Sequence, residues 1–65
     1  MNLLINGSET KVEVGTIEEL LNFLNKKPEF LAVAVNKKFV PKNSYPEYKL
    51  SEGDHVEIVT PHPGG

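Results

Sequence analysis

The stretch GTIEELLNFLNKKP, residues 15–28, predicts the single helix around which the rest of the chain can fold. Its apolar residues recur at intervals of three and four, which is the spacing of one helix face. They are Ile17, Leu20, Leu21 and Leu24. Thr16 suits the N-cap, and Glu19 stands three residues later, where a capping box needs a carboxylate. Pro28 cannot continue a helix, so we expect the helix to cover about residues 17–25.

Two strand-like runs precede the helix. MNLLI, residues 1–5, is largely apolar, and SETKVEV, residues 8–14, alternates polar and apolar side chains with the period of a half-buried strand. The dipeptide NG at residues 6–7 lies between them and readily adopts the positive φ angles of a tight hairpin turn. The amino-terminal part is therefore predicted to form a β-hairpin.

Three further strand-like runs follow the helix, at residues 30–35, 39–40 and 55–60. The intervening segment, residues 41–48, is rich in turn-forming residues and predicts a loop that Leu50 would anchor to the core. The order β, β, α, β, short β, β predicts an α+β fold in which a mixed sheet wraps around one helix. That architecture is the ubiquitin-like β-grasp, with the first and last strands parallel at its centre.

The composition narrows the function classes. The chain has 65 residues, a formal net charge of −2 and no cysteine, which excludes disulfides, catalytic thiols and cysteine-ligated metals. An acidic balance argues against nucleic-acid binding. No apolar run approaches the roughly 20 residues that span a bilayer, and no secretory signal is recognisable. We therefore expect a soluble, cytoplasmic protein whose domain covers residues 1–60 and whose flexible C-terminal tail covers residues 61–65.

Several ordered segments resemble the ThiS family, the sulfur carrier proteins of thiamine (thiazole) biosynthesis. The segments are NG, TIEELL, AVAVN, FVPK, LSEGDHVEIV and the final GG, and together they extend over essentially the whole chain. Two positions depart from the family pattern. Lys42 stands where an arginine is usual and lacks the planar fork of that side chain. Residues 61–63, Pro-His-Pro, replace a usually apolar approach to the glycines.

The resemblance implies that Gly65 is the residue that is modified. A ThiF-like adenylating enzyme would use ATP to convert its carboxylate into an acyl-adenylate. Sulfur from a donor protein would displace AMP, and the resulting thiocarboxylate would donate sulfur to thiazole synthase. The chain itself would be no enzyme and would bind no cofactor, since it has no phosphate-binding glycine loop. The partner would bind the ATP.

The last residues suit threading into a narrow channel of a partner. Gly64 and Gly65 have no Cβ atom, so that end of the chain is slim. Five extended residues reach about 17 Å. Pro61 and Pro63 favour an extended path, which lowers the entropy lost on binding. We expect Gly64, Pro63 and His62 to thread into the partner.

Strand alternation also predicts a surface for that partner. Ala34 and Val59 are expected to point away from the helix and to form a small apolar patch that faces the activating enzyme. Glu57 and Lys42 would lie at its rim. Scattered apolar side chains are, however, normal on protein surfaces. A metal site is not expected, because the two imidazoles have no further ligands at suitable spacing.

Three alternatives share the predicted fold. One is a sulfur carrier that resembles the small subunit of molybdopterin synthase. Another is a ubiquitin-like protein modifier in which Gly65 becomes joined to a lysine of a target protein. The third is a β-grasp binding module whose tail has no chemical role. The sequence favours the ThiS-like carrier, and the others stay open at this stage.

Overall fold

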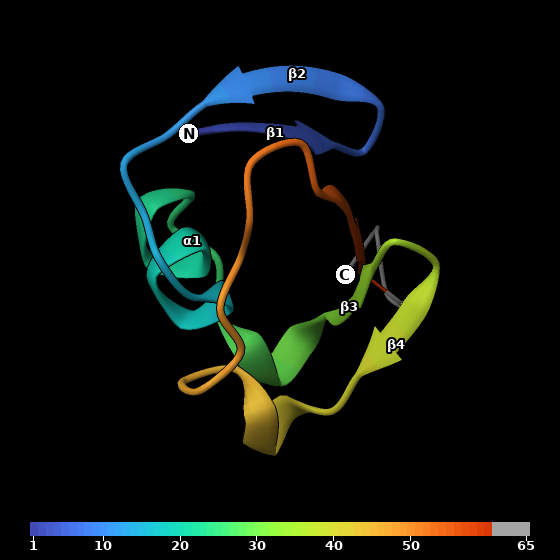
Figure 1. Ribbon diagram of the computed structural model, residues 1–65. Helices are drawn as coiled ribbons and strands as arrows, with labels where there is room; N and C mark the ends of the chain where they lie inside the picture. Colours follow the sequence, from blue (N-terminus) through green and yellow to red (C-terminus); the bar gives the residue numbers. More distant parts are fainter. Residues whose placement is uncertain (61–65) are drawn as a thin grey trace.

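The computed structural model describes residues 1–60, in which five strands form one sheet in the order β2-β1-β5-β3-β4. The strands are β1 (Asn2–Ile5), β2 (Ser8–Lys11), β3 (Ala32–Val35), β4 (Lys38–Val40) and β5 (His55–Val59). One α-helix, α1 (Ile17–Phe23), and two short 3-10 helices, η1 (Pro28–Phe30) and η2 (Lys42–Ser44), connect them. The sheet curves around α1 (Figure 1).

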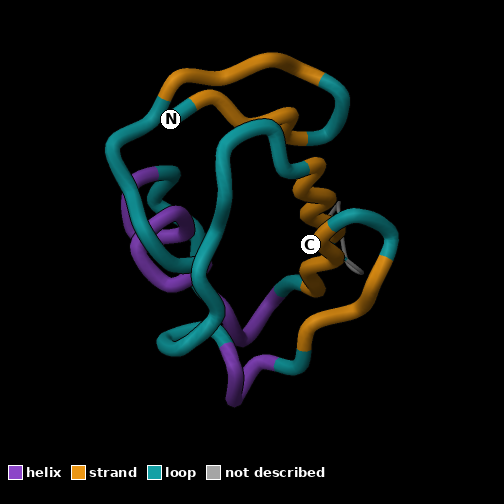
Figure 2. Tube along the Cα trace, viewed as in Figure 1, coloured by secondary structure: helices purple, strands orange, loops and turns teal. Residues whose placement is uncertain are grey.

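The centre of the sheet is the pairing of the first and last strands. β1 and β5 run parallel, with Leu4 opposite His55 and Ile5 opposite Val56. All other pairings are antiparallel: β1 with β2, β3 with β5, and β3 with β4. The two hairpins therefore lie on opposite sides of β5 (Figure 2). The predicted mixed sheet, with its first and last strands side by side, is confirmed.

The start of α1 has the predicted capping box. The Thr16 hydroxyl accepts the N–H of Glu19 at 3.2 Å, and the Glu19 carboxylate accepts the N–H of Thr16 at 3.2 Å. The helix ends earlier than the predicted residue 25, because Leu24 is already the C-cap and Asn25 has a φ of 59°. A left-handed residue at this position stops an α-helix.

The core lies between α1 and the inner face of the sheet. Its fully buried side chains come from every large element and from the segment after β2. They are Leu3, Val12, Ile17, Leu20, Leu21, Val33, Val35 and Val56. Leu50 anchors the long loop as predicted, but Tyr45 is equally buried and shares that role. The carbonyl of Tyr45 also accepts the N–H of Glu18 at 3.1 Å, which joins the loop to the first turn of α1.

Two strand boundaries differ from the prediction. The run expected to be a strand from residue 30 begins with η1, and β3 starts only at Ala32. Pro28 opens this 3-10 turn, and the N–H of Phe30 donates to the carbonyl of Lys27 at 3.2 Å. The second strand ends at Lys11 instead of residue 14. Lys11 already pairs with Asn2, the first residue of β1, so little partner strand remains beyond it.

Candidate functional site

The side of the sheet that faces away from α1 is called here the outer face. Along β5, Val56 and Ile58 are buried, whereas His55, Glu57 and Val59 are exposed. Val59 is 59% exposed, a high value for an aliphatic side chain in a central strand. Glu57 and Val59 therefore point away from the core, as the alternation predicted.

Neighbouring strands extend this surface. Ala34 of β3 lies between Glu57 of β5 and Phe39 of β4, and Ala32 lies opposite Val59. Phe39 is 69% exposed, the largest fraction among the big apolar side chains of the described residues. The four apolar residues form what we call the outer patch, namely Ala32, Ala34, Phe39 and Val59. Glu57 is charged and lies directly opposite Ala34 on the same face of the sheet.

Two residues of the outer patch, Ala32 and Phe39, were missing from the sequence prediction. The period of two contained the signal for both. Val40 is buried on β4, so Phe39 before it must face outward, and Ala32 has the same parity as Ala34. The run containing Phe39 was too short to show alternation without a known partner strand. The pairing of Phe39 with Ala34 in the sheet shows that the two side chains lie on the same face.

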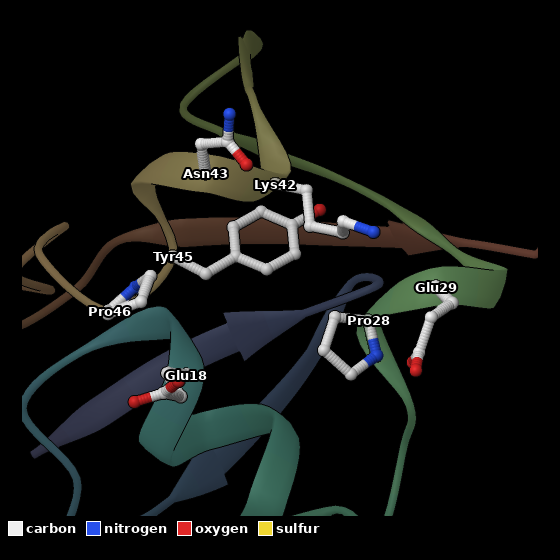
Figure 3. Close-up of a pocket in the computed structure, with 7 residues that line it drawn as sticks. All are labelled: Glu18, Pro28, Glu29, Lys42, Asn43, Tyr45 and Pro46. Atoms are coloured by element: carbon white, nitrogen blue, oxygen red, sulfur yellow. The ribbon is translucent and has the colours of Figure 1, made fainter.

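Lys42, the fourth predicted interface residue, borders a second feature of the surface, and its predicted place at the rim of the patch stays a prediction. It lies in η2 and lines a hollow of about 350 Å³ between η2, η1 and the start of α1. The other lining residues are Glu18, Pro28, Glu29, Asn43, Tyr45 and Pro46. Figure 3 shows the Tyr45 ring at the centre of this group, with Lys42 and Glu29 to one side of it. The structure thus groups Ala34, Glu57 and Val59 on the outer face and places Lys42 beside the hollow.

Tyr45 has a structural role in that hollow. Its side chain is only 3% exposed. Burial raises the pKa of its hydroxyl above the ordinary value, while a hydrogen bond with the backbone of Val33 acts in the opposite direction. The hydroxyl therefore stays neutral near pH 7, and its ring supports the loop.

The end of β5 is held by a side chain. Asn6 follows β1, and its amide oxygen accepts the N–H of Ile58 at 2.8 Å while its Nδ2 donates to the carbonyl of Ile58 at 3.2 Å. β1 ends at Ile5, so these two side-chain bonds take the place of the backbone hydrogen bonds that a longer β1 would make with Ile58. Asn6 therefore fixes the direction of β5 close to the point where the chain continues toward residues 61–65, which lie outside the described residues.

Two further features are absent from the described part of the chain. Residues 1–60 contain no group of three or more His, Cys, Asp or Glu side chains that could hold a metal ion. Over the same residues, no helix has the length and apolar character needed to cross a membrane. The predicted tail residues His62, Pro63, Gly64 and Gly65 lie beyond them, so their roles stay predictions.

Comparisons with known proteins agree on one family. The model of the ThiS family matches residues 3–65. A thiazole synthase from Paramagnetospirillum magneticum is 39% identical over 66 residues, which cover all of this chain and 20% of that protein. The chain thus spans about a fifth of the length of this curated relative.

Solved structures give the same result. The crystal structure of a thiamine biosynthesis protein (ThiS) from Geobacter metallireducens matches with a TM-score of 0.85 and 28% identity over the full length of both chains. A solution NMR structure of a thiamine biosynthesis protein from the same organism matches with a TM-score of 0.76 and 27% identity. It covers 91% of this chain and 81% of that one. The likeness therefore extends from sequence to backbone.

Proposed function

The chain belongs to the ThiS family, the sulfur carriers of thiamine biosynthesis, and we propose that it carries sulfur as a thiocarboxylate on Gly65. A ThiF-like enzyme activates that residue, and thiazole synthase receives the sulfur. The chain is then a protein co-substrate acted on by its partners. The cytoplasm, where ATP is abundant, is the compartment that suits this chemistry.

Activation is needed because a free carboxylate is a poor acceptor for nucleophiles. One carboxylate oxygen of Gly65 attacks the α-phosphorus of ATP, which the activating enzyme binds, and pyrophosphate leaves. A hydrogen sulfide ion, supplied through a sulfur donor protein, then attacks the carbonyl carbon of the acyl-adenylate and loses its proton to solvent. The bond from that carbon to the AMP oxygen breaks, AMP departs, and the thiocarboxylate remains. Its sulfur is the nucleophile toward the substrate in thiazole synthase.

The observation that supports this proposal most is the family match through residue 65, which includes Gly64 and Gly65. The relative named thiazole synthase supports the choice of recipient, because a segment similar to this whole chain is part of that protein. A fixed β5 also suits the role. Asn6 holds the strand at Ile58, so the residues that follow start from a defined position.

We assign the outer patch to the docking of the activating enzyme. Val59 is the last residue of β5, so a partner that takes up the tail must approach the surface beside it. The patch offers apolar area there, and Glu57 supplies a charge that can fix the orientation. Apolar residues in the centre of an interface with charges around them are typical of protein complexes. Lys42 lies beside the hollow near α1 and is not counted in the patch.

Intact mass spectrometry tests the proposed chemistry. The full chain is incubated with the activating enzyme, ATP and a sulfur source, and the expected product has one oxygen replaced by sulfur. A chain without Gly65 is the matched control and should keep its fold, as NMR spectra would show, but gain no sulfur. An isopeptide-linked product would instead identify a protein modifier. No change in mass would contradict the proposal and would favour the remaining alternative, a binding module whose tail has no chemical role.

Complementation separates the pathways. Expression of the intact chain should restore thiazole production in cells that lack their own carrier, and the chain without Gly65 should not. Restoration of molybdopterin synthesis alone would instead assign the chain to that pathway.

A further inference from the structure

The turn between β3 and β4 contains an unusual residue. Asn36 and Lys37 have φ angles of 52° and 70°, so both adopt left-handed conformations in a type I′ turn. Asparagine tolerates this region because its short polar side chain can form local hydrogen bonds, whereas lysine carries the Cβ penalty without that compensation. Among residues 1–60, Lys37 is the one residue other than Asn and Gly with a positive φ. Folding alone would favour glycine at this position.

A small hollow lies at the same turn. Its volume is about 240 Å³, and it is lined by Asn36, Lys37 and His55. Each of these side chains carries N–H donors and also exposes carbon, which makes up most of the lining, and no carboxylate is among the lining residues. This donor set suits an anionic group.

Hydrogen bonds hold the floor of the hollow in place. The Asn36 amide oxygen accepts the N–H of His55 at 3.0 Å, and its Nδ2 donates to a carboxylate oxygen of Asp54 at 3.0 Å. The other Asp54 oxygen accepts the N–H of Ser51 at 2.8 Å. Asp54 is therefore occupied by donors of its own chain. The Lys37 ammonium and the His55 imidazole remain as the donors that a ligand could use.

The hollow borders the outer patch. His55 has the same orientation on β5 as Glu57 and Val59, and Phe39 follows Lys37 by two residues. From His55 to Val59 the strand advances about 13 Å. A partner that covers the outer patch from the tail end would reach the hollow at the far end, because standard interfaces bury about 800 Å² on each side.

We propose that this hollow binds a carboxylate side chain of thiazole synthase when the synthase docks on the outer face, in the step after the activating enzyme has left that surface. The inference rests on the proposed function. Three observations support this occupant: the lining of donors, its continuity with the outer patch, and the relative named thiazole synthase that contains a segment similar to this chain. Lys37 is kept in a disfavoured conformation because its ammonium group serves the complex.

The test is a substitution with opposite effects on folding and binding. Lys37→Gly should raise the urea midpoint of the free chain, because the turn loses its strained residue. The same change should weaken binding to full-length thiazole synthase on the order of tenfold and reduce the salt dependence of that binding. Isothermal titration calorimetry at two ionic strengths measures both quantities. If Lys37 had only a structural role, Lys37→Gly would not raise the stability of the chain while lowering its affinity for the synthase.

Control variants make the result decisive. Lys37→Arg should retain the affinity, and Lys37→Asn, which keeps a residue that tolerates positive φ, should lose it as glycine does. Lys27→Gln removes the same charge away from the outer face and should bind like the unchanged chain. Equal affinities for the Lys37→Gly, Lys27→Gln and unchanged chains would overturn the inference. Loss of binding to the activating enzyme alone would also overturn it, because the hollow would then belong to that partner.

The outcome is separable from that of the proposed function. Binding is measured with the unmodified chain, whereas sulfur transfer to Gly65 is read from intact mass. A chain that gains sulfur normally and binds the synthase equally well with or without Lys37 contradicts only the present inference. A chain that gains no sulfur contradicts the proposed function, whatever Lys37 contributes to binding.

Discussion

The two hairpins of the sheet make the same type of turn with different residues in the second position. The β1–β2 turn uses Asn6 and Gly7, with φ angles of 50° and 84°, and the β3–β4 turn uses Asn36 and Lys37. Both asparagines also bind the backbone of β5 through their side chains, Asn6 near its end and Asn36 at its start. Glycine at the second position is what folding of such a turn favours. Lysine at the same position in the second hairpin indicates a role other than folding.

The largest effect on stability is expected at Asn6. Asn6→Ala removes both hydrogen bonds to Ile58, which are part-buried, and places at a φ of 50° a residue that tolerates the left-handed region less well than asparagine. We expect a loss of about 2–3 kcal/mol in the free energy of unfolding, measured by urea denaturation. Asn6→Asp keeps the acceptor for the Ile58 N–H and should lose less. An unchanged midpoint for Asn6→Ala would show that the side chain is dispensable.

The corresponding change in the second hairpin should cost less. Asn36→Ala removes the bonds to His55 and Asp54, but these groups are exposed and water can replace the partners. The expected loss is about 1 kcal/mol, because exposed hydrogen bonds contribute little net stability. Measuring both variants under one set of conditions ranks the two asparagines directly. A larger loss for Asn36 than for Asn6 would reverse the assignment of Asn6 as the main support of β5.

Gly7→Lys places in the β1–β2 turn the residue type that Lys37 provides in the β3–β4 turn. A Cβ atom at Gly7 would meet no atom within 4 Å, so the cost comes from the backbone conformation alone. We expect a destabilisation of about 1 kcal/mol, close in size and opposite in sign to the effect of Lys37→Gly. Thermal unfolding of both variants tests the symmetry. A neutral Gly7→Lys would mean that lysine is tolerated in such turns and would remove the argument from strain at Lys37.

The smallest effect on stability is expected on the outer face. Val59 is 59% exposed, so Val59→Asp should change the free energy of unfolding by no more than about 0.5 kcal/mol. The same change should raise the carrier concentration needed for half-maximal adenylation, because it introduces a charge into the outer patch. Lys11→Gln, a charge change at the opposite edge strand, is the control. Equal adenylation kinetics for all three proteins would exclude Val59 from the interface.

Much of the fold could be predicted because local patterns carried it. The spacing from Ile17 to Leu24 identified the helix, and the alternation in β5 identified which side chains face outward. The dipeptide at Asn6 and Gly7 identified the first turn. These features depend on residues close together in sequence, so periodicity and turn preference are sufficient to find them.

What escaped prediction depends on contacts between distant residues. Asn6 binds Ile58 across 52 positions, and no local pattern shows that a turn residue reaches the last strand. Phe39 joined the outer patch only once its pairing with Ala34 was known. The place of Lys42 at the hollow follows from the 3-10 turn after Pro41, which the sequence presented only as a loop. Long-range packing decides such details.

The central place of β5 also has a mechanical consequence. The strand is bonded to β1 on one side and β3 on the other, and an asparagine side chain secures it near each end. A partner that draws on the carboxyl end pulls along this strand, so its bonds are loaded in shear and must rupture together. We expect the domain to stay folded when a partner enzyme pulls on its carboxyl end.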